Sequence, residues 1–190
     1  LFAKSDSSRE TPNLQFHVQP ISTDKLGGAS LHDFHAFTPT VANIRPTSRG
    51  EINIISKDSR EKPKIKMNYL STEDDRKVAA DGLRLVRDIV FKSQTFKKYH
   101  PEELRPGSQF QSNEELVQEG SKFTQTIFHP VGTCKMGNDE NAVVNDELKV
   151  HGIQNLRIID ASIMPNITSG NTNAPTIMIA EKGADMILGK

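Results

Sequence analysis

Residues 160–176 read DASIMPNITSGNTNAPT, a loop rich in Asn, Thr, Gly and Pro that leads into an apolar pattern with helical spacing. The pattern predicts a helix over 174–188. Asn173 is a good N-cap for it, and Pro175 falls in its first turn, where a missing N–H costs nothing. Such a helix directs free backbone N–H groups and a partial positive charge toward the preceding loop, which suits an anionic group. A well-capped terminal helix without a ligand is the alternative interpretation. The apolar stripe of this helix consists of Ile177, Ala180, Ala184 and Ile187.

A second polar loop, HPVGTCKMG, occupies residues 129–137 and begins with His129. A neutral imidazole is the usual proton acceptor at neutral pH, although a single His before a Pro also suits a purely structural turn. Cys134 makes a Cys/His nucleophile or a metal pair conceivable. A nucleophile needs a third orienting group, however, and a zinc site needs three or four ligands. The other histidines show no ligand spacing, so we expect no metal and take Cys134 as a small packing residue.

The first part of the chain favours strands. Residues 13–20 alternate between apolar and polar side chains, which is typical of a half-buried strand. Residues 34–44 are β-leaning but contain Pro39, so we expect an edge strand or a bent one. Two shorter strands are predicted at 51–56 and 64–69. Together these segments predict an antiparallel sheet with short connections.

Helical signals begin after the strands. The segment STEDD, residues 71–75, combines a hydroxyl cap with an acidic first turn and predicts a helix that runs to about Val90. The segment SNEE, residues 112–115, is a capping box for a second helix that runs towards Phe123. The residues between these helices, 96–111, contain prolines and a glycine and are predicted to form a surface connection. A short buried strand is expected at 156–160.

The remaining segments are polar or rich in glycine. Residues 1–12 predict a linking or frayed start, and residues 26–30, LGGAS, predict a loop. The chain opens at Leu1 without an initiator Met or a targeting pattern, which leads us to expect a piece of a longer polypeptide.

Composition excludes several classes of protein. Of the 190 residues 35% are hydrophobic and 25% are charged, which predicts one folded domain with a modest core. Lys+Arg and Asp+Glu balance at 24 each, so a nucleic-acid partner or an anionic membrane surface is not indicated. No apolar run approaches the ~20 residues of a spanning helix. The single cysteine fits a reducing compartment, and we expect a cytoplasmic protein.

The two loops resemble the signature of the glucose–methanol–choline (GMC) family of flavoproteins. Residues 129–137 resemble the histidine motif of that family, and VVNDELKVHG at 143–152 resembles the segment that follows it. Residues 156–185 resemble the C-terminus of the family almost position by position, and PTSRG at 46–50 also fits. The likeness covers nearly all of 13–189. Within the family it is greatest to the choline dehydrogenases and related alcohol dehydrogenases.

The resemblance implies an α+β fold and a division of labour along the chain. Residues 13–128 would form a substrate-binding domain, an antiparallel sheet with flanking helices, after a linker at 1–12. Residues 129–190 would supply the active-site loops and the C-terminal strand and helix that complete the FAD-binding domain. The sequence lacks Gly-x-Gly-x-x-Gly after a strand, the motif for the ADP part of FAD. The resemblance therefore implies that an N-terminal half of the same polypeptide binds most of the cofactor.

The resemblance also implies roles for individual residues. His129 matches the active-site histidine of the family, and Asn171 matches its partner. His17 resembles a substrate-pocket histidine of choline-oxidising members. Four further residues match positions that meet the cofactor: Asp160, Ala161, Asn173 and Ala174.

The implied activity is that of an FAD-dependent alcohol dehydrogenase. A hydride would pass from a primary alcohol carbon to flavin N5 while His129 and Asn171 act at the hydroxyl group. Two other readings stay open: a lyase on the same fold that keeps a redox-idle flavin, and a non-catalytic structural or interaction module. The small alcohol, the electron acceptor and the choice between dehydrogenase and oxidase are not specified by these residues. The isolated chain is expected to be colourless and inactive.

Overall fold

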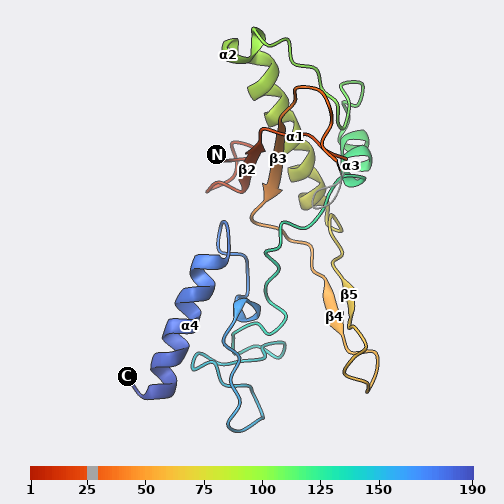
Figure 1. Cartoon of the computed structure of the whole chain (residues 1–190). Helices are drawn as coiled ribbons and strands as arrows, with labels where there is room; N and C mark the ends of the chain where they lie inside the picture. Colours follow the sequence, from red (N-terminus) through yellow and green to blue (C-terminus); the bar gives the residue numbers. More distant parts are fainter. Residues whose placement is uncertain (25–29) are drawn as a thin grey trace. The chain divides into compact units, whose positions relative to one another are not determined.

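A computed structural model describes residues 1–24 and 30–190 (Figure 1). The loop predicted at 26–30 therefore lies, apart from Ser30, outside the described residues. Within the described residues the strands come first, in two small antiparallel sheets, and the helices follow. This arrangement confirms the predicted α+β class.

The chain forms two compact units. Unit 1 consists of Leu1–Asn43 and Thr72–Thr124, and unit 2 consists of Ile44–Ser71 and Gln125–Lys190. Each unit is therefore assembled from two separate stretches of sequence.

The sheet of unit 1 contains β1 (Phe2–Ala3), β2 (Leu14–Gln19) and β3 (Thr38–Asn43), in the order β1-β2-β3. Both pairings are antiparallel, and Val18 lies opposite Pro39. Since β3 is the edge of this sheet, Pro39 sits where a missing N–H is tolerated, as predicted. Residues 1–12 were expected to be a linking or frayed start, but they contribute β1.

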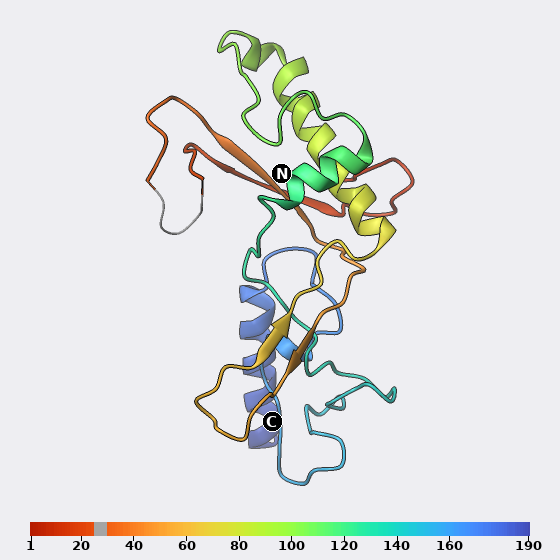
Figure 2. The ribbon, with the colours of Figure 1, turned by 90° about the vertical axis from the view of Figure 1, so that its right-hand side faces the viewer.

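The helix α1 (Glu73–Lys92) covers one face of this sheet (Figures 1 and 2). It begins where predicted, at the N-cap Thr72, whose hydroxyl oxygen accepts the N–H of Asp75 at 3.3 Å. Side chains alternate across a strand, so Leu14 and Phe16 point to one face and His17 to the other. The core of unit 1 consists of Leu14, Phe16 and Val78, with Ala3, Val41, Leu85 and Val86 packed against it.

The helix α3 (Asn113–Ser121) packs against α1 and starts with the predicted capping box (Figure 2). The hydroxyl of Ser112 accepts the N–H of Glu115 at 3.2 Å, and the Glu115 carboxylate accepts the N–H of Ser112 at 3.0 Å. Backbone N–H donors from Ser112 and Gln111 lower the pKa of Glu115. The helix is anchored by Leu116, whose side chain is fully buried.

The connection between α1 and α3 contains the short helix α2 (Gln94–Lys97) and is held by one ion pair. Arg87 donates to both carboxylate oxygens of Glu103 at 2.9 and 2.8 Å, and also to the carbonyl oxygens of Phe110 and Gly107. The two side chains are 14% and 9% exposed. Glu103 in turn accepts the N–H of Gly107 at 3.1 Å, so the pair closes the connection onto the helix.

Unit 2 contains a separate hairpin of β4 (Glu51–Asn53) and β5 (Lys64–Lys66), which pair only with each other within the described residues. The prediction that the segments 13–20, 34–44, 51–56 and 64–69 form one sheet is therefore wrong. Period-two alternation identifies a strand, but it does not identify the strand beside it. On the hairpin Ile52 and Ile65 lie opposite each other and are 47% and 61% exposed.

The core of unit 2 lies between irregular segments, the short 3₁₀ helix η1 (Ala161–Ile163) and the helix α4 (Asn173–Leu188). Glycine allows α4 to approach closely, because a Cβ atom at Gly183 would lie 2.5 Å from Cγ2 of Ile159. The buried members of this core are Val144, Leu148, Ile163, Met164 and Ile179.

One expectation for this region is wrong. Residues 156–160 are not a strand, because they pair only through an isolated bridge between Arg157 and Lys149. The neighbouring segment cannot stay extended, since Leu148 has a φ of 63°. On α4 the apolar stripe named from the sequence is exposed: Ile177 and Ile187 are 55% and 59% exposed, and Ala180 and Ala184 are exposed too. The buried residues of α4 are Ile179 and Gly183.

Replacing Gly183 with Ala is expected to destabilise the chain by about 1 kcal/mol. Overpacking against Ile159 costs about 1–3 kcal/mol, and the gain in helix propensity offsets about 1 kcal/mol of it. Gly120→Ala in α3 is the matched control, because its Cβ would lie 3.4 Å from Leu83 and clash with nothing. That control should stabilise by about 0.5–1 kcal/mol. Urea unfolding measures both; a cost for Gly183→Ala that persists in the Ile159→Ala background would contradict the proposed clash.

Candidate functional site

The two polar loops of unit 2 meet at His129. The amide nitrogen Nδ2 of Asn171 lies 2.8 Å from Nε2 of the imidazole, although the residues are 42 positions apart in the sequence. His129 is partly exposed and Asn171 is exposed, so the pair is open to a small molecule. An imidazole nitrogen beside an amide offers a proton acceptor and a hydrogen-bond donor to the same atom of a ligand.

The other ring nitrogen of His129 contacts Thr172. Its hydroxyl oxygen Oγ1 lies 2.9 Å from Nδ1. Thr172 is only 6% exposed, and it is the N-cap of α4, which corrects the prediction of Asn173 by one residue. Its side chain makes no capping hydrogen bond to the helix, because the hydroxyl is turned toward the imidazole instead.

The loop that begins at His129 is attached to η1 by backbone hydrogen bonds. Cys134 donates its N–H to the carbonyl of Ser162 at 3.0 Å, and Met136 donates to Ile163 at 2.8 Å. Gly132 has a φ of 89°, and a Cβ atom there would lie 3.3 Å from the carbonyl oxygen of Met164. The glycine therefore lets the loop lie directly on the segment that leads to Asn171.

The four residues expected at the cofactor fall at two helix starts in unit 2. Asp160 is the N-cap of η1 and accepts the N–H of Ser162 at 2.7 Å, and Ala161 is the first residue of that helix. Asn173 and Ala174 open α4 and are both exposed. The first N–H groups of a helix have no partner inside it, so this end offers donors and a partial positive charge to a ligand.

His17 belongs to unit 1, where it lies on β2 opposite Thr40. It points to the face of the sheet that α1 does not cover. Its Nε2 is buried and has no hydrogen-bond partner among the described residues. Buried polar atoms are rarely left unpaired, so this nitrogen is a candidate for contact with a ligand or another part of a longer chain.

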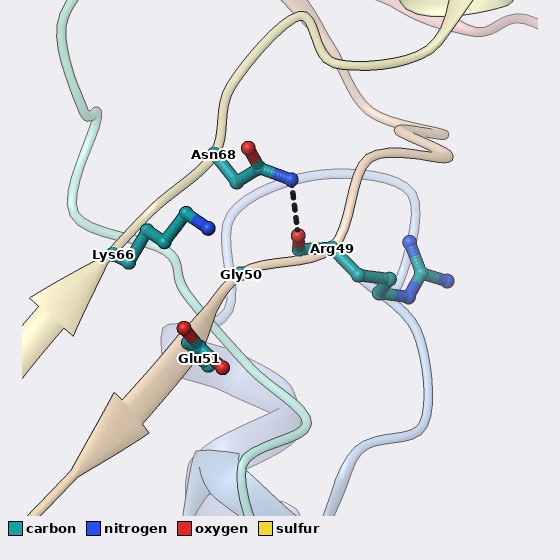
Figure 3. A pocket seen from close by; sticks show the side chains of 5 residues that line it. All are labelled: Arg49, Gly50, Glu51, Lys66 and Asn68. Carbon is teal, nitrogen blue, oxygen red and sulfur yellow. Dashed lines mark hydrogen bonds between the residues drawn. The ribbon is translucent and has the colours of Figure 1, made fainter.

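A further set of polar contacts joins the segment at 46–50 to the loop at 160–176. Asn68 donates from Nδ2 to the carbonyl oxygen of Arg49 at 2.9 Å, at a shallow pocket lined by Gly50, Glu51 and Lys66 as well (Figure 3). The Arg49 guanidinium points away from these residues and donates to Oδ1 of Asn166 at 2.9 Å. Arg49 therefore bridges the turn to the loop that carries Asn171.

Among the described residues no group of three or more His, Cys, Asp or Glu side chains is placed to hold a metal ion. In the same part of the chain, no helix is both long and apolar enough to cross a bilayer.

Comparison with known proteins assigns the family. The family model described as GMC oxidoreductase matches residues 46–180, a range that contains both loops. The chain belongs to the GMC oxidoreductase family. The family prediction made from the two loops is therefore confirmed.

Curated relatives within the GMC oxidoreductases are considerably longer than this chain. The oxygen-dependent choline dehydrogenase of Pseudomonas savastanoi pv. phaseolicola is 45% identical over 189 residues, which are 100% of this chain and 33% of the relative. The enzyme of the same name from Proteus mirabilis is 45% identical over 188 residues, 99% of this chain and 34% of the relative. The chain thus spans about a third of the length of the curated relatives it matches.

Solved GMC oxidoreductase structures share the fold. The pyridoxine 4-oxidase from Mesorbium loti has a TM-score of 0.87 and 27% identity, with 100% of this chain and 37% of that one covered. A formate oxidase variant of Aspergillus oryzae, described for its FAD modification, has a TM-score of 0.80 and 28% identity over 95% of this chain and 32% of that one.

Sequence reasoning missed two residues that support the site. Thr172 and Asn166 both lie in the loop that was singled out, but neither was assigned a contact. The available signal was weak, because a Thr before a helix is ordinarily a cap and a loop Asn is ordinarily a turn residue.

Proposed function

We propose that this chain is the C-terminal, substrate-side part of an FAD-dependent alcohol dehydrogenase of the choline dehydrogenase type. The observation that carries the proposal is the 2.8 Å contact between Nε2 of His129 and the amide of Asn171, made by two separate loops. Membership of the GMC family and relatives named choline dehydrogenase support the reaction class.

The residues present fit one edge of FAD. The start of α4 offers the N–H groups of Asn173 and Ala174 and a partial positive charge, a donor set that suits carbonyl oxygens and negative charge on a flavin ring. Asp160 and Ala161 at the start of η1 would also contact the cofactor. FAD, when bound, would supply the acceptor for the hydride of the alcohol carbon, a chemistry that no side chain supplies.

His129 and Asn171 act on the hydroxyl group in this proposal. The alcohol hydroxyl takes the place of the Asn171 N–H at Nε2 of His129, whose single lone pair then accepts the hydroxyl proton as the carbon loses its hydride, so the alcohol becomes a carbonyl product. The amide of Asn171 donates to the alcohol oxygen and thereby orients the C–H bond. The N-terminus of α4 stabilises the negative charge that develops beside it.

The substrate side of the proposal includes His17. Its buried Nε2 lacks a partner among the described residues and sits on the sheet face opposite α1, so we assign it to the pocket for a small primary alcohol. We propose the domain division that the family resemblance implies: a substrate-binding domain at 13–128, to whose sheet residues 2–3 add β1, and the active-site loops with α4 at 129–190.

The remaining polypeptide is the proposed partner of unit 2. The outward face of α4 exposes apolar side chains, with Met178 at 59% and Leu188 at 64% exposed. A contiguous apolar face on a helix marks an interaction surface. We propose that the N-terminal, FAD-binding part of the longer protein covers it. We also propose a cytoplasmic location, because the single cysteine of this chain fits a reducing compartment.

Anaerobic addition of choline or another primary alcohol to the full-length protein is expected to bleach its yellow flavin absorbance, with one carbonyl product formed per flavin reduced. Stopped-flow absorbance and product analysis measure this directly. Release of an aldehyde from a cyanohydrin without bleaching would instead favour the same-fold lyase. The absence of any bleaching or aldehyde release across a broad alcohol and cyanohydrin panel would favour the non-catalytic module.

A further inference from the structure

We propose that Thr172 is a positioning residue that holds His129 through Nδ1 and, together with Asn171, favours the tautomer in which Nε2 carries no proton. The inference rests on the proposed role of His129 as proton acceptor. The Thr172 side chain does not itself touch the reacting atoms.

The local structure of α4 supports this assignment. A threonine at an N-cap ordinarily accepts a backbone N–H of the first turn, and that contact stabilises a helix by about 1 kcal/mol. Thr172, whose φ and ψ are −90° and 0°, makes no such side-chain bond, and its hydroxyl lies 2.9 Å from Nδ1 of His129. With 6% exposure the side chain is also confined by packing. The helix start therefore gives up a cap in favour of the imidazole.

The two ring nitrogens have different partners, and these decide the tautomer. Asn171 presents Nδ2 to Nε2 at 2.8 Å, and an amide nitrogen only donates, so Nε2 accepts and carries no proton. Nδ1 then carries the proton and donates it to Oγ1 of Thr172 at 2.9 Å. The unprotonated Nε2 is the form that takes a proton from an alcohol.

One contact opposes this tautomer. The backbone N–H of Thr172 also points at Nδ1, from 3.4 Å, and it is satisfied only if Nδ1 accepts. The amide and hydroxyl contacts are both about half an ångström shorter and therefore outweigh it. If the hydroxyl is removed, the proton on Nδ1 loses its acceptor and faces the backbone N–H, so this tautomer is destabilised although the amide of Asn171 still favours it. The hydroxyl of Thr172 thus opposes the effect of the Thr172 backbone N–H on the ring proton.

Thr172→Val removes the hydroxyl and keeps the shape, whereas Thr172→Ser keeps the hydroxyl. In the full-length, FAD-loaded protein the Val variant is expected to lower kcat for the alcohol about 10- to 100-fold with a smaller change in KM, and the Ser variant to stay within about 3-fold. In ¹⁵N spectra of histidine-labelled protein at mildly alkaline pH, the ring proton should sit on Nδ1 in the wild type and the Ser variant, and the fraction of His129 that carries it on Nε2 should rise in the Val variant. The His129 signals are identified by their loss in His129→Gln.

Thr176→Val is the matched control, because the Thr176 hydroxyl donates to the carbonyl of Thr172 at 2.6 Å and not to the ring of His129. It should retain wild-type kcat. Equal slowing of the Thr176 variant, failure of Ser to rescue, or an Nδ1 proton that stays in place in the Val variant would each overturn the assignment. A wild-type protein that oxidises no alcohol would refute the proposed function, and the ¹⁵N spectra would still decide whether Thr172 controls the ring.

Discussion

His129→Ala in the full-length, FAD-loaded protein is expected to lower kcat for alcohol oxidation by about 10²- to 10³-fold. The substitution removes the proton acceptor at the hydroxyl group, and loss of one such polar group at a reacting centre typically has an effect of this size. Anaerobic flavin reduction in a stopped-flow instrument measures the chemical step without interference from reoxidation. Binding of FAD should be preserved, since no proposed cofactor contact involves the imidazole.

Asn171→Ala is the second variant in this test and is expected to lower kcat about 10²-fold. Since Asn171 contacts Nε2 of His129, the two side chains act as a unit, and the double variant should lose much less than the product of the single effects. His35→Ala, an exposed histidine of unit 1, is the control that should leave the rate unchanged. Wild-type turnover by His129→Ala, or fully multiplicative losses, would contradict the pair.

Arg87→Ala is expected to have the largest effect on stability, a loss of about 3 kcal/mol. The substitution leaves the Glu103 carboxylate, 9% exposed, without its bidentate partner, and removal of one member of a buried pair is strongly destabilising. It also frees the carbonyls of Gly107 and Phe110, so the connection between α1 and α3 should loosen first. Urea unfolding followed by circular dichroism gives the free energy, and hydrogen exchange over residues 98–112 locates the loss.

Arg60→Ala is the matched control, because Arg60 makes the same two-pronged contact with Asp58 at 2.9 and 2.7 Å. The Arg60 side chain is 88% exposed, so its removal should leave the unfolding free energy unchanged within error. The double change Arg87→Met with Glu103→Met should recover much of the loss, because no charge is then left unpaired. Equal effects of the two arginine changes would show that burial is not the cause.

Local patterns in the sequence were sufficient for the three longer helices, α1, α3 and α4, and for most of the strands. The caps at Thr72 and Ser112 bind the backbone of their own first turns, so neighbouring residues determine them. The strand at 14–19 follows from its alternation, which depends only on the geometry of an extended chain. The family was predicted from two loop motifs. The same motifs gave the two candidate catalytic residues, His129 and Asn171.

Only the tertiary structure decided which segments meet. It put the hairpin of β4 and β5 in a unit apart from β2 and β3, and it buried Ile179 of α4 in place of Ile177. It also turned the hydroxyl of Thr172 from its helix to the imidazole of His129. These outcomes depend on residues that are distant in the sequence. A residue pattern predicts the conformation of its own segment, but it does not identify the surface against which that segment packs.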